Sequence, residues 1–213
     1  SRAPADTQVA VADALDKARL TEAVVASEPD VIVHQLTALT GASIRNFDKG
    51  FAMTNRLRTE GTDNLLAAAE QAGVKAFIAQ SYAGWPQGFS GSLIKTEAEP
   101  LADDAPATML RSLAAFRHLE GAVTAFGGIV HRYGGLYGPG TNLASDGEMT
   151  TLIRKRLVPI VGSGDGVWSF LHVDDAARAV VASLDHRGGG IFNVADDEPA
   201  ATKDWLPYLA KIL

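Results

Sequence analysis

Short apolar runs alternate with amphipathic stretches along the chain. The runs at 31–36 and 76–81 flank a long helical pattern over 43–71, which Gly73 closes. Short apolar runs predict strands, whereas apolar positions three to four residues apart predict helices. Strand, helix and strand in this order predict parallel strands joined by right-handed crossovers.

The remaining patterns extend this α/β alternation to the last residue. The segment 83–106 is rich in Gly, Pro, Ser and acidic residues, which predicts a long loop of the kind that is often functional or disordered. Helices are predicted at 15–27, 109–126, 147–156, from 174 and at 202–213, and strands at 8–12, 129–133, 158–161, 167–172 and 190–195.

Composition narrows the classes of function. The 213 residues are 46% hydrophobic, enough for one substantial core. A net charge of −6 with scattered cations favours a small-molecule substrate and gives no reason to expect nucleic acid or an anionic membrane as partner. Without cysteine, disulfides and thiolate sites are excluded. No apolar run reaches the roughly 18 residues of a membrane span, and residues 1–4 do not resemble a signal peptide. We therefore expect a cytoplasmic protein.

Eight short segments, taken together and in this order, are more informative than any one of them. They lie at 12–16, 29–34, 60–66, 73–77, 95–101, 132–140, 170–177 and 192–194. The sixth reads Arg132-Tyr-Gly-Gly-Leu-Tyr-Gly-Pro-Gly140 and the seventh Phe170-Leu-His-Val-Asp-Asp-Ala-Ala177. In this order the segments resemble the extended short-chain dehydrogenase/reductases, also called the NAD-dependent epimerase/dehydratase family.

This resemblance implies a Rossmann-type doubly wound parallel sheet that binds NAD or NADP. It implies a dinucleotide-binding domain over 1–140 and a partial substrate-binding lobe over 141–213, with Rossmann elements interleaved in the lobe. The family's first strand, first helix and most of its second strand, with the Gly-x-x-Gly-x-x-Gly turn that approaches the pyrophosphate, are expected to be missing from these residues. The last segments of the substrate lobe are expected to be missing too.

Ligands of such sheets lie at the carboxyl ends of the strands. Arg2 would suit a 2′-phosphate and so slightly favours NADP over NAD, although an exposed terminal arginine accounts for it equally well. The resemblance places Asp13 near the adenine ring. It also implies cofactor contacts at Gln35, Leu36, Thr37, Gln80, Tyr133 and Gly134, and substrate contacts at Lys95, Leu136, Tyr137 and Trp168.

The family's catalytic pair is absent from this chain. In the family, a Tyr and a Lys four residues later transfer the proton while the nicotinamide transfers hydride. Counting back from Glu120, those positions hold Ser112 and Phe116. A shifted alignment cannot restore the pair, because no Tyr occurs between positions 82 and 133 and no Lys between 95 and 155.

Other residues are therefore candidates for catalysis. Ser81 and Tyr82 lie where the family has its catalytic Ser or Thr, so Tyr82 is either a relocated proton donor or an aromatic wall of the pocket. Arg58 replaces an Asn that is frequent in the family. Arg58 or Arg132 could supply the cation that tunes a phenol, hold a structural ion pair or bind a substrate anion. Lys95 is either a solvated loop cation or a contact to the substrate.

The histidines are not assigned to a metal. His34 lies in an apolar strand pattern, which predicts a buried and hydrogen-bonded imidazole. The resemblance implies that Asp174 caps the following helix and that His172 packs below the cleft. Trp168 either lines the substrate pocket or fills the core of the small lobe.

Two functions from different classes remain open. The first is an NAD(P)-dependent oxidoreductase or epimerase/dehydratase-like enzyme for a small hydroxyl or carbonyl compound or a sugar derivative. The second is a non-catalytic family member, which senses a dinucleotide or metabolite or serves in an assembly. In either case, a sheet without its first strands would expose an apolar edge, so we expect a homo-oligomer.

Overall fold

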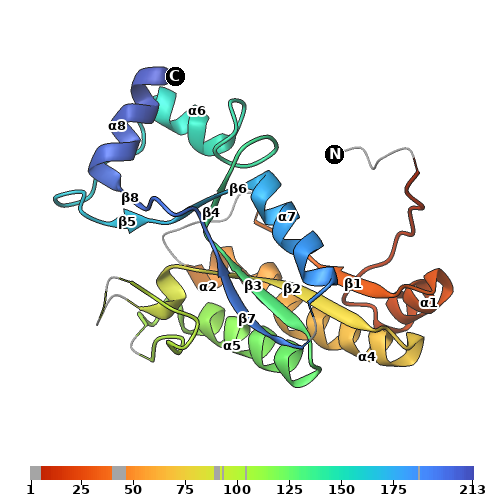
Figure 1. Cartoon of the computed structure of the whole chain (residues 1–213). Coiled ribbons are helices and arrows are strands. Elements are labelled where there is room, and N and C mark those ends of the chain that lie inside the picture. Colours follow the sequence, from red (N-terminus) through yellow and green to blue (C-terminus); the bar gives the residue numbers. More distant parts are fainter. Residues whose placement is uncertain (1–5, 40–46, 89–91, 93, 104, 187) are drawn as a thin grey trace. The chain divides into compact units, whose positions relative to one another are not determined.

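The computed structural model describes residues 6–39, 47–88, 92, 94–103, 105–186 and 188–213. Helices and strands alternate over most of this range (Figure 1). The helices are α1 (Lys17–Ser27), α2 (Phe47–Gly50), α3 (Ala52–Arg56), the π-helix η1 (Leu57–Gly61), α4 (Thr62–Ala72), the 3-10 helix η2 (Trp85–Gln87), α5 (Leu110–Ala125), α6 (Glu148–Arg154), α7 (Val173–Leu184) and α8 (Thr202–Ile212). The strands are β1 (Val31–His34), β2 (Ala76–Tyr82), β3 (Ile129–Tyr133), β4 (Gly135–Tyr137), β5 (Val167–Trp168), β6 (Phe170–His172), β7 (Gly190–Val194) and β8 (Ala200–Ala201).

The largest sheet has four strands in the order β1-β2-β3-β7. Strands β1 and β2 are parallel, with Val31 opposite Ala76 and His34 opposite Ala79. Two smaller sheets consist of the parallel pair β4 and β6 and the antiparallel pair β5 and β8. The α/β fold with a parallel central sheet is thereby confirmed.

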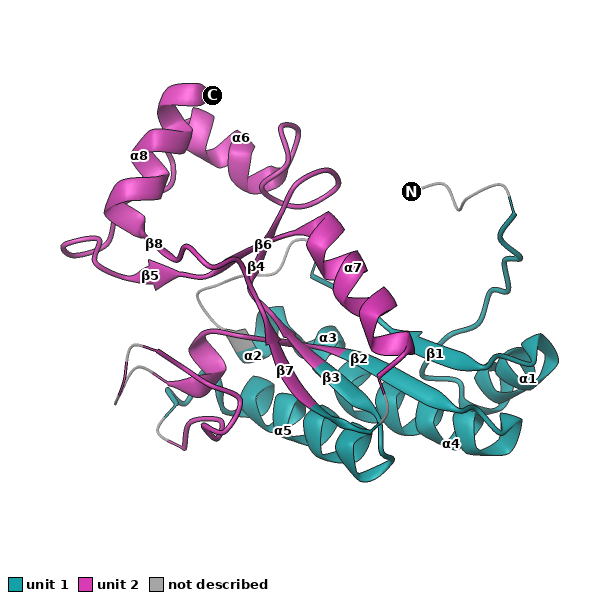
Figure 2. Ribbon diagram, in the orientation of Figure 1, with its two compact units in different colours: residues 1–79, 105–130, 188–190 teal, residues 80–104, 131–187, 191–213 magenta. Residues whose placement is uncertain are grey.

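The chain divides into two compact units (Figure 2). Unit 1 consists of Ser1–Ala79, Ala105–Val130 and Gly188–Gly190. Unit 2 consists of Gln80–Asp104, His131–Arg187 and Ile191–Leu213. Because each unit combines distant stretches of the chain, neither corresponds to a single continuous segment, and the division of the sequence at residue 140 stays a prediction.

Unit 1 is held together by helices whose apolar stripes face inward. Helix α4 buries Leu65, Ala68 and Ala69, which recur at the spacing of one helical face, and it packs against α1 and α5. Gly73 ends α4 in the left-handed conformation, with φ of 67°, which glycine adopts without steric cost. Asp16 begins α1 by accepting the N–H of Arg19.

Unit 2 has its own small core. Tyr133, Leu171 and Ala176 are buried there, and Leu136 and Val194 pack against them. Helix α7 begins at Val173, immediately after β6, and Ala176 is its buried residue. The parallel pair β4 and β6 thus joins the Tyr133 region to the first turn of α7.

The predicted strands at 8–12 and 158–161 do not form. Val9 and Val11 are 72% and 96% exposed, and no described strand pairs with their segment, so their apolar character alone does not make a strand. The predicted strand 167–172 is split at Ser169 into β5 and β6, which pair with different partners. The pattern missed β4 and β8, which are too short to show a period. The expected self-association stays a prediction.

Candidate functional site

The position at which the family has its catalytic tyrosine is fully buried in unit 1. The Ser112 hydroxyl donates to Asp48 Oδ1 at 3.0 Å and accepts from Asn55 Nδ2 at 2.9 Å. The backbone N–H groups of Arg111 and Ser112 also donate to Asp48, at 3.0 and 2.8 Å. Since Met109 offers α5 no side-chain cap, the Asp48 carboxylate satisfies its first turn instead. Ser112 is therefore a structural bridge whose proton is already donated.

The position of the family's lysine is occupied by an aromatic ring that carries a cation on its face. The Arg58 guanidinium carbon lies 3.8 Å from the centroid of the Phe116 ring. This distance is within the range of a cation–π contact. On its other side, Arg58 Nη1 donates to Asn55 Oδ1 at 3.4 Å. We call Asp48, Asn55, Arg58, Ser112 and Phe116 the Arg58 cluster.

Arg58 itself is 7% exposed. It lies in η1, the π-helical turn between α3 and α4, and such turns are rare and are frequent at functional sites. Burial lowers the pKa of the guanidinium to about 10, so Arg58 remains a cation at neutral pH. The predicted catalytic residue Arg58 is thus a charged group within a neutral, apolar and amide-lined surrounding.

His34 ends β1 and is 2% exposed. Its Nε2 lies 3.1 Å from Thr62 Oγ1, which confirms the predicted buried and hydrogen-bonded imidazole. Burial is the main cause that lowers the His34 pKa to about 4, with a smaller lowering from the Arg58 charge, and the imidazole is neutral at pH 7. His34 therefore adds no second positive charge to that of Arg58.

The predicted cofactor contacts in unit 1 are accessible where they are described. Gln35, Leu36 and Thr37 follow β1 directly and are exposed. Asp13 is exposed too, and its carboxylate accepts the N–H of Leu15 at 2.9 Å, as an ordinary turn residue does. Arg2 lies outside the described residues. The cofactor roles of all five stay predictions.

Ser81 and Tyr82 end β2 and belong to unit 2, with Gln80 before them. Ser81 is buried, and burial raises the pKa of the Tyr82 phenol. A neighbouring cation would lower that pKa, and desolvation is the cause that acts here. Gly84 has φ of 147°, and a Cβ there would lie 2.9 Å from the Tyr82 ring, so glycine lets the chain pass close to the phenol. Tyr82 is therefore a partly buried phenol whose raised pKa keeps it neutral at pH 7.

Tyr133 and Gly134 lie inside unit 2. The Ala83 N–H donates to the Tyr133 carbonyl at 2.9 Å, which joins the ends of β2 and β3. The Tyr133 hydroxyl donates to the Ala176 carbonyl at 3.5 Å and lies 3.4 Å from His131 Nδ1, while His131 Nε2 lies 2.8 Å from Ser183 Oγ. We call His131, Tyr133 and Ser183 the His131 cluster. The Tyr133 side chain contributes to the core of unit 2, and the cofactor contacts of Tyr133 and Gly134 stay predictions.

Two of the predicted substrate residues meet in an aromatic group of unit 2. The Tyr137 ring lies edge-on to Phe170 at 6.3 Å, and the Trp168 ring stacks on Phe170 at 5.9 Å. Trp205 completes the group, 5.6 Å from Trp168. Trp168 remains 40% exposed, so it is part of a surface-accessible aromatic face. Leu136 packs against the small core instead.

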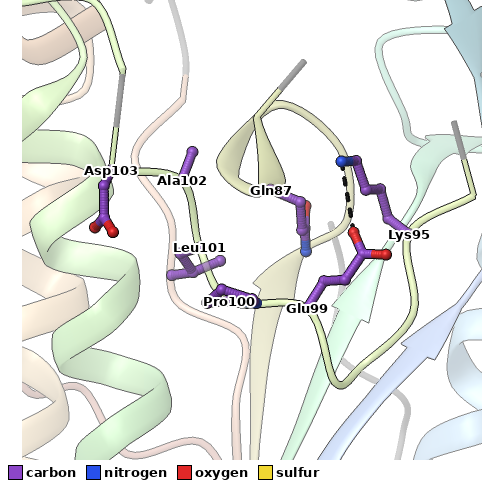
Figure 3. Close-up of a pocket in the computed structure, with 7 residues that line it drawn as sticks. All are labelled: Gln87, Lys95, Glu99, Pro100, Leu101, Ala102 and Asp103. Carbon is purple, nitrogen blue, oxygen red and sulfur yellow. Dashed lines mark ion pairs between the residues drawn. The ribbon is translucent and has the colours of Figure 1, made fainter. Parts of the chain in front are cut away.

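Lys95 belongs to the 83–106 loop and pairs with Glu99 at 3.5 Å. Both line an open cavity of about 340 Å³, together with Gln87, Pro100, Leu101, Ala102 and Asp103 (Figure 3). The lining contains one cation, Lys95, and two carboxylates, Glu99 and Asp103. Lys95 is paired with Glu99. The predicted substrate role of Lys95 stays a prediction.

The helix cap predicted for Asp174 is wrong. The residue before α7 is His172, and its Nδ1 accepts the N–H of Asp174 at 3.2 Å. The imidazole thereby satisfies a free donor of the first helical turn, which is the usual task of a short polar side chain. The Tyr137 ring packs against the same imidazole at 5.0 Å.

Sequence reasoning missed Asp48 and Asn55. Both contact Ser112 from 64 and 57 residues away along the chain, so no local pattern reveals them. Asn55 precedes Arg58 by three residues, a spacing at which helical side chains can meet, and this was the only available signal.

Comparison with known proteins gives the class of this fold. A sequence model of the NAD dependent epimerase/dehydratase family matches residues 1–195. The chain belongs to this family. Among solved structures, UDP-glucose 4-epimerase from Thermotoga maritima, crystallised with UDP-glucose, aligns with a TM-score of 0.78 at 21% identity over 94% of this chain. The Bordetella bronchiseptica enzyme WbmG, in complex with NAD and UDP, aligns with a TM-score of 0.74 at 20% identity over 98% of this chain. At these identities the likeness concerns the Rossmann-type fold alone.

A more similar relative is the 3-diazoavenalumate denitrifying reductase of a Streptomyces species, which is 44% identical over 100% of this chain. The uncharacterized protein y4nL of Sinorhizobium fredii is 23% identical over 97%. The chain spans 70% of the length of the reductase, 57% of y4nL, 66% of the epimerase and 64% of WbmG. None of the described helices is both long and apolar enough to cross a membrane.

Proposed function

We propose that this chain belongs to a reductase that uses NAD(P)H to add hydride to an electrophile that needs no phenolic proton donor, with a diazonium compound, the protonated form of a diazo compound, as the substrate class. This proposal depends on the contacts that Ser112 and Phe116 make. The Ser112 hydroxyl donates its proton to Asp48, and the Phe116 ring makes a cation–π contact with the Arg58 guanidinium. Neither position can deliver a proton to a substrate, and the 44% identical relative is named for a reaction on a diazo compound.

The chemistry of a diazonium group explains how such a site could work. Reduction of a carbonyl consumes a hydride and a proton, which is why a positioned acid accelerates it. Reduction of a diazonium group, R–N₂⁺, consumes a hydride alone: its electron pair forms the new bond, R–H and N₂ result, and the reduced nicotinamide becomes oxidised. The positive charge passes from the diazonium group to the nicotinamide ring, and no proton is required.

The residues fit a nicotinamide dinucleotide in part. Gln35, Leu36 and Thr37 are exposed at the carboxyl end of β1, the side on which parallel sheets of this kind hold their ligand. For the carboxyl ends of β2 and β3, the cofactor contacts that we propose are Gln80, Tyr133 and Gly134. The structures of the Bordetella enzyme contain NAD, while a preference for NADP rests on Arg2 alone. The substrate residues that we propose are Tyr137 and Trp168, whose aromatic faces suit a planar compound.

The test compares two electrophiles on the full-length protein, each with NADH and with NADPH. The probes are 4-carboxybenzenediazonium, which needs hydride alone, and 4-carboxybenzaldehyde, which also needs a proton. We expect benzoate and N₂ from the first, and turnover of the second slower by about 10²-fold, the usual contribution of a general acid. A reaction without protein corrects for direct reduction of the diazonium salt.

The variant Tyr82→Phe separates the alternatives. If no phenol participates, the diazonium rate stays within about twofold, because the change removes only one hydroxyl. Equal rates with both probes, together with loss of aldehyde reduction in Tyr82→Phe, would instead assign Tyr82 as a relocated proton donor. Failure of the full-length protein to bind either dinucleotide would favour the non-catalytic family member.

A further inference from the structure

Arg58 is a buried cation that has no counterion among the residues that the structure describes. Asn55 and Phe116 are its only partners among the described residues, and neither carries a charge. Burying a charge in an apolar surrounding costs free energy, so buried guanidinium groups are normally paired with a carboxylate or a phosphate. The cation–π contact and one amide hydrogen bond offset a part of this cost and leave the charge unneutralised.

The nearby groups that might neutralise Arg58 are already committed. Both Asp48 oxygens accept hydrogen bonds from the first turn of α5, and the Ser112 hydroxyl adds a third. Asn55 then links Ser112 to Arg58, so two neutral side chains separate the Asp48 carboxylate from the guanidinium. The result is a cation that is oriented by a hydrogen-bonded chain and has no anionic partner in the described part of the chain.

The backbone also favours a binding role. Arg58 is carried by the π-helical turn η1, an uncommon conformation between two regular helices. The Arg58 guanidinium carbon lies 3.8 Å from the centroid of the Phe116 ring, a cation–π contact that restrains the group without neutralising its charge. A planar fork with parallel N–H groups matches the two oxygens of a carboxylate.

We infer that Arg58 binds a carboxylate of the substrate, a role that rests on the proposed reductase function and defines its substrate class as anionic. The local charge favours a monoanion. Because His34 is neutral, Arg58 and His34 together offer one positive charge, which matches one carboxylate and undercompensates a pyrophosphate. The name of the 44% identical relative, a diazo compound ending in "-ate", is consistent with an acidic substrate.

The test is an equilibrium titration of the full-length protein that contains no cofactor and no reaction. NMR signals of the arginine Nε–Hε groups report binding of benzoate, of neutral benzamide and of inorganic pyrophosphate. We expect benzoate to shift the Arg58 signal and to bind about tenfold or more tightly than benzamide, the scale of one charge-assisted contact. Pyrophosphate should not compete at equal concentration.

Three variants assign the effect to Arg58. Arg58→Met should weaken benzoate binding by about tenfold or more, and Arg58→Lys, which keeps the charge but loses the fork, by about threefold to tenfold. Arg56→Met is the matched control, because Arg56 lies on the same helical stretch but is exposed and paired with Glu60 at 2.7 Å. It should bind benzoate as the unchanged protein does. Thermal unfolding of each variant establishes that it is folded.

Three results would overturn the inference. Benzoate that binds Arg58→Met as well as the unchanged protein, or not at all to either, contradicts a carboxylate site. Equal binding of benzamide contradicts a role for the charge. Pyrophosphate that displaces benzoate and depends on Arg58 would assign the cation to the dinucleotide. Because the titration needs no turnover, a failed reductase assay leaves its result intact.

Discussion

The Arg58 cluster of unit 1 and the His131 cluster of unit 2 are both networks of polar side chains, and they differ in the charges that they contain. In the His131 cluster, neutral groups bond to one another, and burial lowers the pKa of His131. In the Arg58 cluster, the hydrogen bonds are satisfied around Ser112, but a positive charge remains. The hydrogen bonds of the neutral His131 cluster are explained by their contribution to stability. The charge of Arg58 lowers stability unless an anion binds it, so we expect a ligand there.

The largest expected effect comes from restoring the family's lysine. Phe116→Lys would place an ammonium group against the Arg58 guanidinium, now 3.8 Å above that ring, inside the core. Two buried like charges should lower the free energy of unfolding by about 4 kcal/mol or prevent folding. Phe116→Leu, which loses the ring but adds no charge, should cost about 1 to 2 kcal/mol. Urea unfolding measures both, and similar losses would contradict a cationic Arg58 at this place.

The second prediction concerns pH and His34. Its folded pKa of about 4 lies below the ordinary 6.5, so the unfolded chain binds the proton more tightly. Stability from this group is therefore complete above pH 6.5 and is lost as the pH falls toward 4, by about 3 kcal/mol. His34→Gln should remove this part of the acid dependence. The exposed His118, which pairs with Asp63, provides the control: His118→Gln should leave the slope in place.

A smaller difference separates Ser112, which is buried, from Ser183, which is partly buried. Ser112→Ala removes a hydroxyl that bridges a carboxylate and an amide, and it should cost about 2 kcal/mol. Ser183→Ala removes a hydroxyl between His131 and the Ala179 carbonyl, and it should cost about 1 kcal/mol, since no charged group is involved. Chemical denaturation of both variants gives the order, and the reverse order would weaken the distinction between the two clusters.

The smallest effect has the opposite sign. Arg58→Met replaces an unneutralised buried cation with an apolar side chain of similar length, so the free energy of unfolding should rise by about 1 kcal/mol. A residue that lowers stability where it stands is expected at a binding site. If Arg58→Met instead destabilises the protein by several kcal/mol, the guanidinium is structural, and the comparison between the clusters fails.

The sequence predicted the fold better than the site. The strands at 31–36, 76–81, 129–133 and 190–195 correspond to β1, β2, β3 and β7, because buried parallel strands are nearly continuous apolar runs. The failures, 8–12 and 158–161, are apolar segments that lack a partner strand, which a local pattern does not report. Loss of the family's Tyr and Lys was evident from the positions of these residue types, because no Tyr occurs between 82 and 133 and no Lys between 95 and 155.

The arrangement that replaces the family's Tyr and Lys could not be predicted from the sequence. Arg58 and Phe116 were both noticed, yet their stacking joins residues 58 positions apart and depends on the π-helical turn η1. Asp48 had no signal, since its role is to satisfy backbone N–H groups of a helix far along the chain. Sites built from such long-range contacts require the structure.

The central claim, hydride transfer without a phenolic proton, is tested most directly by following the hydrogen. The full-length protein is given 4-carboxybenzenediazonium with NADH or NADPH that carries deuterium at both C4 positions, in ordinary water. Our account predicts benzoate with deuterium at the former diazonium carbon, released with N₂ at a rate unchanged in Tyr82→Phe. Benzoate whose new hydrogen comes from water, or a reaction that stops in Tyr82→Phe, would contradict it.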